Sequence, residues 1–139
     1  MSQKPFRILG IEHIGIAVDD LNGISDIFGD LIGLELRSRE KIDDQQVITD
    51  IYETGSGKLE FLKATDEDSP ISRFIDKKGK GVHHIALKVD NLQAALDYLK
   101  GQGTQLVDTS PHIGAEGFKI AFLHPKSTGG VLIELCEKK

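Results

Sequence analysis

The sequence predicts an α+β fold of two tandem βαβββ modules, and three observations lead to this prediction. A strand pattern led by histidine occurs twice, as HIGIAV from His13 and HIALKV from His84, which are 71 positions apart (84 − 13 = 71). Each copy runs into an Asp or Asn cap and a helical pattern. Three strand-like segments then follow in each copy. At 139 residues the two modules share one ordinary domain, so we expect a concave mixed sheet.

The first module is expected over residues 8–66. After its first strand, LNGISDIFGDLIG predicts a helix over residues 21–33, because apolar side chains recur at three-to-four spacing up to Leu31 and Ile32. Gly33 is typical of a helix end. The strands expected after it are LELRSRE, QVITDIYE and KLEFLK.

A linker is expected over residues 67–80, where Asp68 or Ser69 can cap a short helix with Pro70 in its first position. Gly79 would close that helix.

The second module is expected over residues 81–137. Its helix reads LQAALDYLKGQG, and its later strands read TQLVDT, FKIAFLH and VLIELCE.

Composition excludes several function classes. A net charge of −5 without a basic cluster argues against nucleic acids and anionic membranes as partners. No apolar run approaches the roughly 18 residues of a membrane span, and the start lacks the layout of a secretion signal. The lone Cys136 fits a reducing compartment and a structural thiol. We therefore expect a cytoplasmic protein.

Strand parity predicts a metal site. Side chains alternate between faces, so His13 and His84 lie opposite the apolar residues that pack on the helices. In the last strand of each module, Glu60 and Glu134 likewise oppose apolar neighbours, at spacings of 47 (60 − 13) and 50 (134 − 84) from the histidines. Two imidazoles and two carboxylates suit a divalent ion, with cobalt, nickel, manganese, iron or zinc all compatible. His83, one residue off the pattern, is expected on the other face in a structural role.

Four segments, IEHIGIAVDDL, DSPISRFI, GVHHIALKVDNL and FLHPKSTGGVLIEL, resemble the vicinal oxygen chelate superfamily and, within it, the methylmalonyl-CoA epimerase family. The resemblance extends from about Ile8 to Glu137. It implies a single vicinal-oxygen-chelate domain whose modules each supply one His and one Glu or Gln to a metal ion. It also implies an acyl-CoA substrate, Co²⁺ with Ni²⁺, Mn²⁺ or Zn²⁺ as alternatives, and a homodimer.

The resemblance implies inversion of a carbon next to a thioester by removal and return of its proton. Glu134 resembles the family residue that binds metal and also acts as one base. The second base belongs on the third strand, where a plain alignment places Thr49. Asp50 is adjacent and is our predicted second base, and Glu53 is nearby.

Binding of CoA requires hydrogen-bond donors or positive charges that contact its phosphate groups. The loops HIGAEGFK and HPKSTGG offer glycine amides beside Lys119 and Lys126, so we expect these lysines with Gly129 and Gly130 to contact CoA. An ordinary hairpin turn explains the same glycines.

Three other functions use the same architecture. Glyoxalase I shares the ligand order, but the arginine-rich glutathione contacts of that family are not found. A metal-free binding protein would not need all four ligands. A ring-cleaving dioxygenase uses two His and one carboxylate, so Glu60 disfavours it.

Overall fold

The computed structural model describes residues 4–138, which divide into two compact units. One unit is the chain up to Glu12 together with the chain from His84 onward, and the other is His13–His83. No helix in the described part of the chain is long and apolar enough to cross a membrane.

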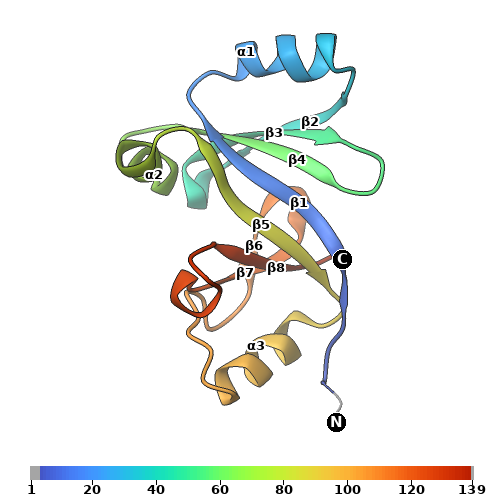
Figure 1. Ribbon diagram of the computed structural model, residues 1–139, viewed down its shortest axis with the longest axis vertical. Helices are drawn as coiled ribbons and strands as arrows, with labels where there is room; N and C mark the ends of the chain where they lie inside the picture. Colours follow the sequence, from blue (N-terminus) through green and yellow to red (C-terminus); the bar gives the residue numbers. More distant parts are fainter. Residues whose placement is uncertain (1–3, 139) are drawn as a thin grey trace. The chain divides into compact units, whose positions relative to one another are not determined.

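The unit His13–His83 contains strands in the order β2-β3-β4-β1 (Figure 1). Their bounds are β1 (Ile8–Val18), β2 (Glu35–Ile42), β3 (Val47–Glu53) and β4 (Lys58–Ala64). β1 runs parallel to β4, and the other neighbours are antiparallel. Residues opposite each other in register share a face of the sheet. Since Glu60 is opposite both Gly15 and Ile51, the register defines a Glu60 face, which also carries His13, opposite Lys58.

The opposite, apolar face of this sheet packs on the first helical segment. Val18, Tyr52 and Phe61 are buried with Leu21, and Phe28 packs against them. Strand alternation predicts this arrangement, because these side chains have the parity opposite to that of the histidine.

The first helical segment differs from the single helix predicted over residues 21–33. α1 (Leu21–Ile24) is capped by Asp20, whose carboxylate accepts a hydrogen bond from the Asn22 N–H, and a π-helix follows over Ser25–Leu31. A π-turn holds more residues than an α-turn, so it rotates later residues off the predicted stripe. Leu31 is therefore 77% exposed and its neighbour Ile32 58% exposed.

The predicted linker helix is present as α2 (Pro70–Lys78), with Ser69 as its cap and Gly79 at its end. The Ser69 hydroxyl accepts a hydrogen bond from the Ile71 N–H at 3.2 Å. Ile71 packs with Ala17, Val47 and Leu62 in an apolar cluster. By register Ala17 and Leu62 lie on the Glu60 face, so α2 covers part of that face.

The other unit repeats the arrangement with strands in the order β5-β8-β7-β6 (Figure 1). Their bounds are β5 (Gly81–Val89), β6 (His112–Ile113), β7 (Lys119–Leu123) and β8 (Ile133–Glu137). α3 (Leu92–Gly101) begins after Asn91, whose side chain accepts a hydrogen bond from the Ala94 N–H. Leu92 and Leu96 on this helix are buried against Val89 and Leu135.

The prediction of a strand at TQLVDT is wrong. Leu106 makes only an isolated bridge to Leu123, and the short strand β6 lies further along the chain. The Asp108 carboxylate accepts the Phe122 N–H at 2.8 Å, so a side chain takes a hydrogen bond that a strand ladder would need.

Candidate metal and active site

The first predicted ligand pair is formed within the unit His13–His83. His13 on β1 and Glu60 on β4 lie on adjacent parallel strands, and His13 Nδ1 is 3.0 Å from Glu60 Oε2. Their exposed fractions are 5% and 4%. A buried carboxylate requires a hydrogen-bonding or charged partner, and the imidazole supplies one.

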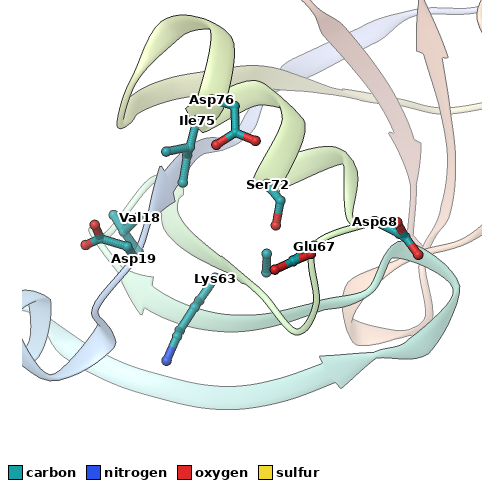
Figure 2. A pocket seen from close by; sticks show the side chains of 9 residues that line it. Val18, Asp19, Lys63, Glu67, Asp68, Ser72, Ile75 and Asp76 are labelled. Atoms are coloured by element: carbon teal, nitrogen blue, oxygen red, sulfur yellow. The ribbon is translucent and has the colours of Figure 1, made fainter.

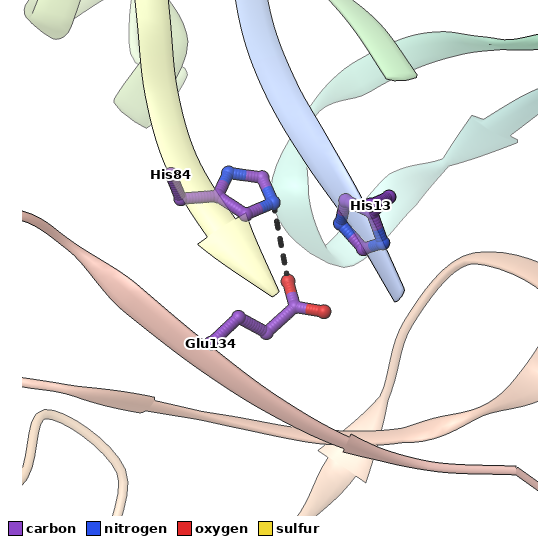
Figure 3. A group of neighbouring side chains, drawn as sticks. All are labelled: His13, His84 and Glu134. Atoms are coloured by element: carbon purple, nitrogen blue, oxygen red, sulfur yellow. Dashed lines mark ion pairs between the residues drawn. The ribbon is translucent and has the colours of Figure 1, made fainter. Parts of the chain in front are cut away.

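The second predicted pair is formed within the other unit. His84 on β5 and Glu134 on β8 are joined by a contact of 3.4 Å between His84 Nε2 and Glu134 Oε1, drawn as the dashed line in Figure 3. Both residues are 4% exposed. The His84 ring also packs edge-on against Phe122, with the ring centroids 5.6 Å apart. This contact orients the imidazole.

The donor set of these pairs fits a divalent metal ion. Each pair supplies an imidazole nitrogen and a carboxylate oxygen, which are the donors that cobalt, nickel, manganese and zinc accept. Carboxylates and imidazoles are seldom this buried unless they are paired or bind a metal. The same residue types occur in both units.

Lys58 is a buried residue near the first pair that sequence reasoning missed. It is 7% exposed and lies opposite His13 in the register of β1 and β4. Its parity was visible in the sequence, because it stands two residues before Glu60 on the same strand. It places a positive charge on the face that carries the predicted carboxylate ligand.

Asp50 does not lie where the second base was predicted. It is opposite Phe61 in the register, so it lies on the helix-covered face and not on the Glu60 face. It is fully buried, and its two carboxylate oxygens accept hydrogen bonds of 2.6 and 2.9 Å from Arg39. Hydrogen bonding to Asp50 and its charge raise the pKa of Arg39. Asp50 therefore has a structural ion-pair role in this fold.

Glu53, also on β3, lies on the face of the sheet opposite to that of Asp50. It is opposite Lys58, which places it on the Glu60 face. Its Oε1 atom is 3.1 Å from Arg37 Nη1, and its Oε2 atom is buried with no hydrogen-bond partner among the described residues. One oxygen is thus held by a cation while the other keeps its lone pairs available.

The residues predicted to contact CoA lie at the start of β7 and in the turn that follows this strand. Lys119 is the first residue of β7, which is about 13 Å long, and Lys126 lies in the turn beyond its end. The backbone N–H of Lys126 donates to His124 Nδ1 at 3.1 Å, and that of Gly130 donates to the Pro125 carbonyl at 2.9 Å. These two amides close the turn itself, as the hairpin-turn interpretation expected.

His83 has the structural environment expected for it. Its ring packs edge-on against Phe74 of α2 at a centroid distance of 4.9 Å. Burial lowers the pKa of His83 to about 4, so the imidazole is neutral at neutral pH.

A separate cavity of about 600 Å³ lies in the unit His13–His83, at the carboxyl ends of β1 and β4 and beside α2 (Figure 2). Its charged lining consists of Asp19, Lys63, Glu67, Asp68 and Asp76. Four carboxylates against one ammonium group do not suit the phosphates of CoA. His13 and Glu60 are not part of its lining.

Comparisons with known proteins place the chain in a family. Residues 12–122 match the model of the glyoxalase/bleomycin resistance protein/dioxygenase superfamily. The uncharacterized protein YqjC of Bacillus subtilis is 41% identical over 93% of this chain and 92% of its own length. The mitochondrial methylmalonyl-CoA epimerase of Mus musculus is 36% identical over 96% of this chain and 76% of its own length.

A solved structure gives the same result. A methylmalonyl-CoA epimerase in complex with methylmalonyl-CoA and NH₄⁺ superimposes with a TM-score of 0.88 at 32% identity, covering 95% of this chain and 96% of that one. The predicted vicinal-oxygen-chelate fold of paired βαβββ modules is confirmed. The chain belongs to the glyoxalase/bleomycin resistance protein/dioxygenase superfamily and, within it, to the methylmalonyl-CoA epimerase family of enzymes.

Proposed function

We propose that this protein is a metal-dependent epimerase that interconverts (S)- and (R)-methylmalonyl-CoA. The observation that carries the proposal is the buried His–Glu pair found once in each unit, at 3.0 and 3.4 Å, in a chain of this family. The related epimerase solved with methylmalonyl-CoA supports an acyl-CoA as the substrate.

In this proposal His13, Glu60, His84 and Glu134 together hold one divalent ion, with Co²⁺ as the first choice and Ni²⁺, Mn²⁺ or Zn²⁺ as alternatives. When bound, such an ion supplies a Lewis acid that stabilises the negative charge on the substrate oxygens as the α-proton leaves. The two glutamates neutralise the charge of the ion, and the histidines add neutral donors.

Inversion needs acid/base groups on the two faces of the α-carbon. Glu134 serves one face, taking the proton on a carboxylate oxygen or returning it. Glu53 replaces Asp50 as our choice for the other face, because it lies on the Glu60 face and has a carboxylate oxygen without a partner. The Arg37 contact holds the Glu53 carboxylate in place.

The experiment that tests this function is proton exchange. The purified protein, loaded with Co²⁺, receives one epimer of methylmalonyl-CoA in D₂O, and NMR follows deuterium entering the α-position. We expect exchange with inversion in the wild type and none in His84→Ala. Absence of exchange in the metal-loaded wild type would refute the epimerase proposal and make the methylglyoxal and glutathione assay the next measurement.

The proposal also includes a cytoplasmic homodimer, as the family resemblance implies. Size-exclusion chromatography with light scattering measures the mass directly. A mass of one 15.2 kDa chain at micromolar concentration would contradict the dimer.

A further inference from the structure

A second cavity lies in the unit formed by the chain up to Glu12 and the chain from His84 onward. Its volume is about 480 Å³, which is within the range of small-molecule sites. It is found at the carboxyl ends of the parallel strands β5 and β8, and its lining consists of Leu9, Lys88, Val89, Asp90, Glu137 and Lys138. Two ammonium groups and two carboxylates therefore belong to this lining.

Both carboxylates of the lining are held by groups of the protein itself. Asp90 Oδ1 accepts a hydrogen bond of 2.7 Å from the Arg7 backbone N–H, and Asp90 Oδ2 lies 3.5 Å from Arg7 Nε. Glu137 Oε1 accepts the Leu92 N–H at 2.7 Å, at the amino-terminal end of α3, where the helix dipole favours a negative charge. The negative charges of the lining are thus compensated within the unit.

The two lysines of the lining are less completely paired. Lys138 Nζ lies 3.4 Å from Glu12 Oε2, and the Lys138 side chain is 43% exposed. Lys88 is partly buried, and among residues 4–138 its ammonium group forms no hydrogen bond or ion pair. Withdrawing an ammonium group from water without an anion is unfavourable, and an anion in the cavity offsets that cost. Unlike the acidic cavity beside α2, this cavity therefore suits an anionic ligand.

The cavity adjoins the sheet face that carries the His–Glu pair of the same unit. Ala86 is opposite Glu134 and Lys88 is opposite Cys136, so Lys88 and Glu134 share a face. Lys138 follows Glu134 by four residues, which is about 13 Å along a strand. In CoA the pantetheine arm joins the thioester to the diphosphate, and the extended arm is long enough to span this distance. An acyl group beside Glu134 therefore allows the CoA phosphates to reach the cavity.

We infer that this cavity binds a phosphate group of the CoA part of the substrate, with the Lys88 ammonium group as its main contact and Lys138 as the second. This inference rests on the proposed function. A phosphate oxygen accepts a charge-assisted hydrogen bond from an ammonium group. Because the phosphates take no part in the proton transfer, this contact binds the substrate and the transition state equally, so it lowers KM and leaves kcat unchanged.

The test is Lys88→Met, which keeps the apolar stem of the side chain and removes its charge. With methylmalonyl-CoA we expect KM to rise about tenfold at unchanged kcat. With methylmalonyl-pantetheine, which has no phosphate group, KM should be the same in the variant and the wild type. Lys88→Arg should keep KM within about threefold of the wild type, because it retains the charge. Lys100→Met, which removes an exposed lysine of α3 outside the lining, should change neither KM nor kcat.

Methylmalonyl-dephospho-CoA, which lacks the 3′-phosphate, identifies the phosphate that is bound. If its KM also rises in Lys88→Met, the contact is with the diphosphate, and if it does not, the contact is with the 3′-phosphate. Calorimetry with CoA itself measures the contact without turnover, and we expect Lys88→Met to bind CoA about tenfold more weakly than the wild type.

Two results would overturn the inference while leaving the proposed function intact. One is a Lys88→Met enzyme whose KM for methylmalonyl-CoA equals that of the wild type. The other is an equal rise of KM for methylmalonyl-CoA and methylmalonyl-pantetheine, which indicates a disturbed active site and not the loss of a phosphate contact. A wild type that binds CoA through Lys88 but exchanges no α-proton would instead refute the proposed function and support the phosphate site.

Discussion

Each of the two units of this protein contains a buried His–Glu pair, but the helices that pack on the two sheets differ. His13 and Glu60 approach to 3.0 Å in one unit, and His84 and Glu134 approach to 3.4 Å in the other. In each case the histidine lies within a strand and the glutamate lies on the parallel neighbouring strand. Because side chains alternate between the two faces of a strand, the histidine and the glutamate share a face in both units, although the helices that pack on the two sheets differ.

The helices are where the units differ. In the unit His13–His83 a short α1 passes into a π-helix, and α2 covers part of the Glu60 face. The other unit has a regular α3 with a buried apolar stripe. A sheet face therefore tolerates different packing elements, provided that its core-facing positions are apolar.

The same substitution at Glu60 and at Glu134 tests whether the two glutamates have different roles. Glu134→Gln should lower kcat about 10²- to 10⁴-fold, because an amide cannot take up the proton. Glu60→Gln should keep most of the activity, because the amide oxygen remains a metal donor and some family members have glutamine there. Equal losses in both variants, with metal content measured in each, would contradict separate roles for the two residues.

The helices should differ in what they contribute to stability. Leu96→Ala on α3 should reduce the free energy of unfolding by about 2–5 kcal/mol, because Leu96 is 1% exposed in a packed core. Leu31→Ala at the end of the π-helix should change it by less than about 0.5 kcal/mol, since Leu31 is 77% exposed. Chemical denaturation measures both values. A large loss for Leu31→Ala would show that its side chain is covered in the folded protein.

Asp50, which is paired with Arg39, can be compared with Glu53, the carboxylate that we propose as the second base. Arg39→Ala should destabilise the protein by about 3 kcal/mol, because it leaves the Asp50 carboxylate buried without its cation. The folded fraction should retain the kcat of the wild type. Glu53→Gln serves as the matched catalytic variant, and it should lose activity while remaining as stable as the wild type. The reverse result would restore Asp50 as the second base.

The smallest expected effect concerns the residue that follows the histidine strand in each unit. Asp90 accepts a hydrogen bond from the Arg7 backbone N–H at 2.7 Å, and this bond, with the Arg7 side chain, lowers the pKa of Asp90 below its usual 3.8. A depressed carboxyl pKa stabilises the fold above the unfolded pKa, and this stabilisation is lost as the pH falls through the folded pKa. Its counterpart Asp19 lies 3.7 Å from Lys80.

We therefore expect Asp90→Asn to be slightly less stable than the wild type at pH 6 and equal to it well below pH 4. Urea unfolding at several pH values measures this difference. A difference between the two proteins that stays constant across this pH range would mean that the Asp90 charge does not contribute.

The sequence was sufficient to predict the repeated strand–helix–strand order, an Asp or Asn cap before the helix of each module, a cap at Asp68 or Ser69 for the linker helix, and the faces of the four predicted ligands. These features follow from local rules, since a strand alternates every residue and a cap bonds within its own turn. The glycines near Lys126 also indicated a turn, and backbone hydrogen bonds such as that from the Gly130 N–H to the Pro125 carbonyl close one there.

The strand register was needed to show on which face of β3 Asp50, Glu53 and Thr49 lie. The alternation was visible in QVITDIYE, but the register with β4 was needed to show which parity faces Glu60. The ion pair to Arg39 joins two strands, and so it depends on their alignment and not on local sequence. Likewise, a hydroxyl is known to be unpaired only when every neighbour is in place, because hydrogen-bond satisfaction is a property of the packed fold.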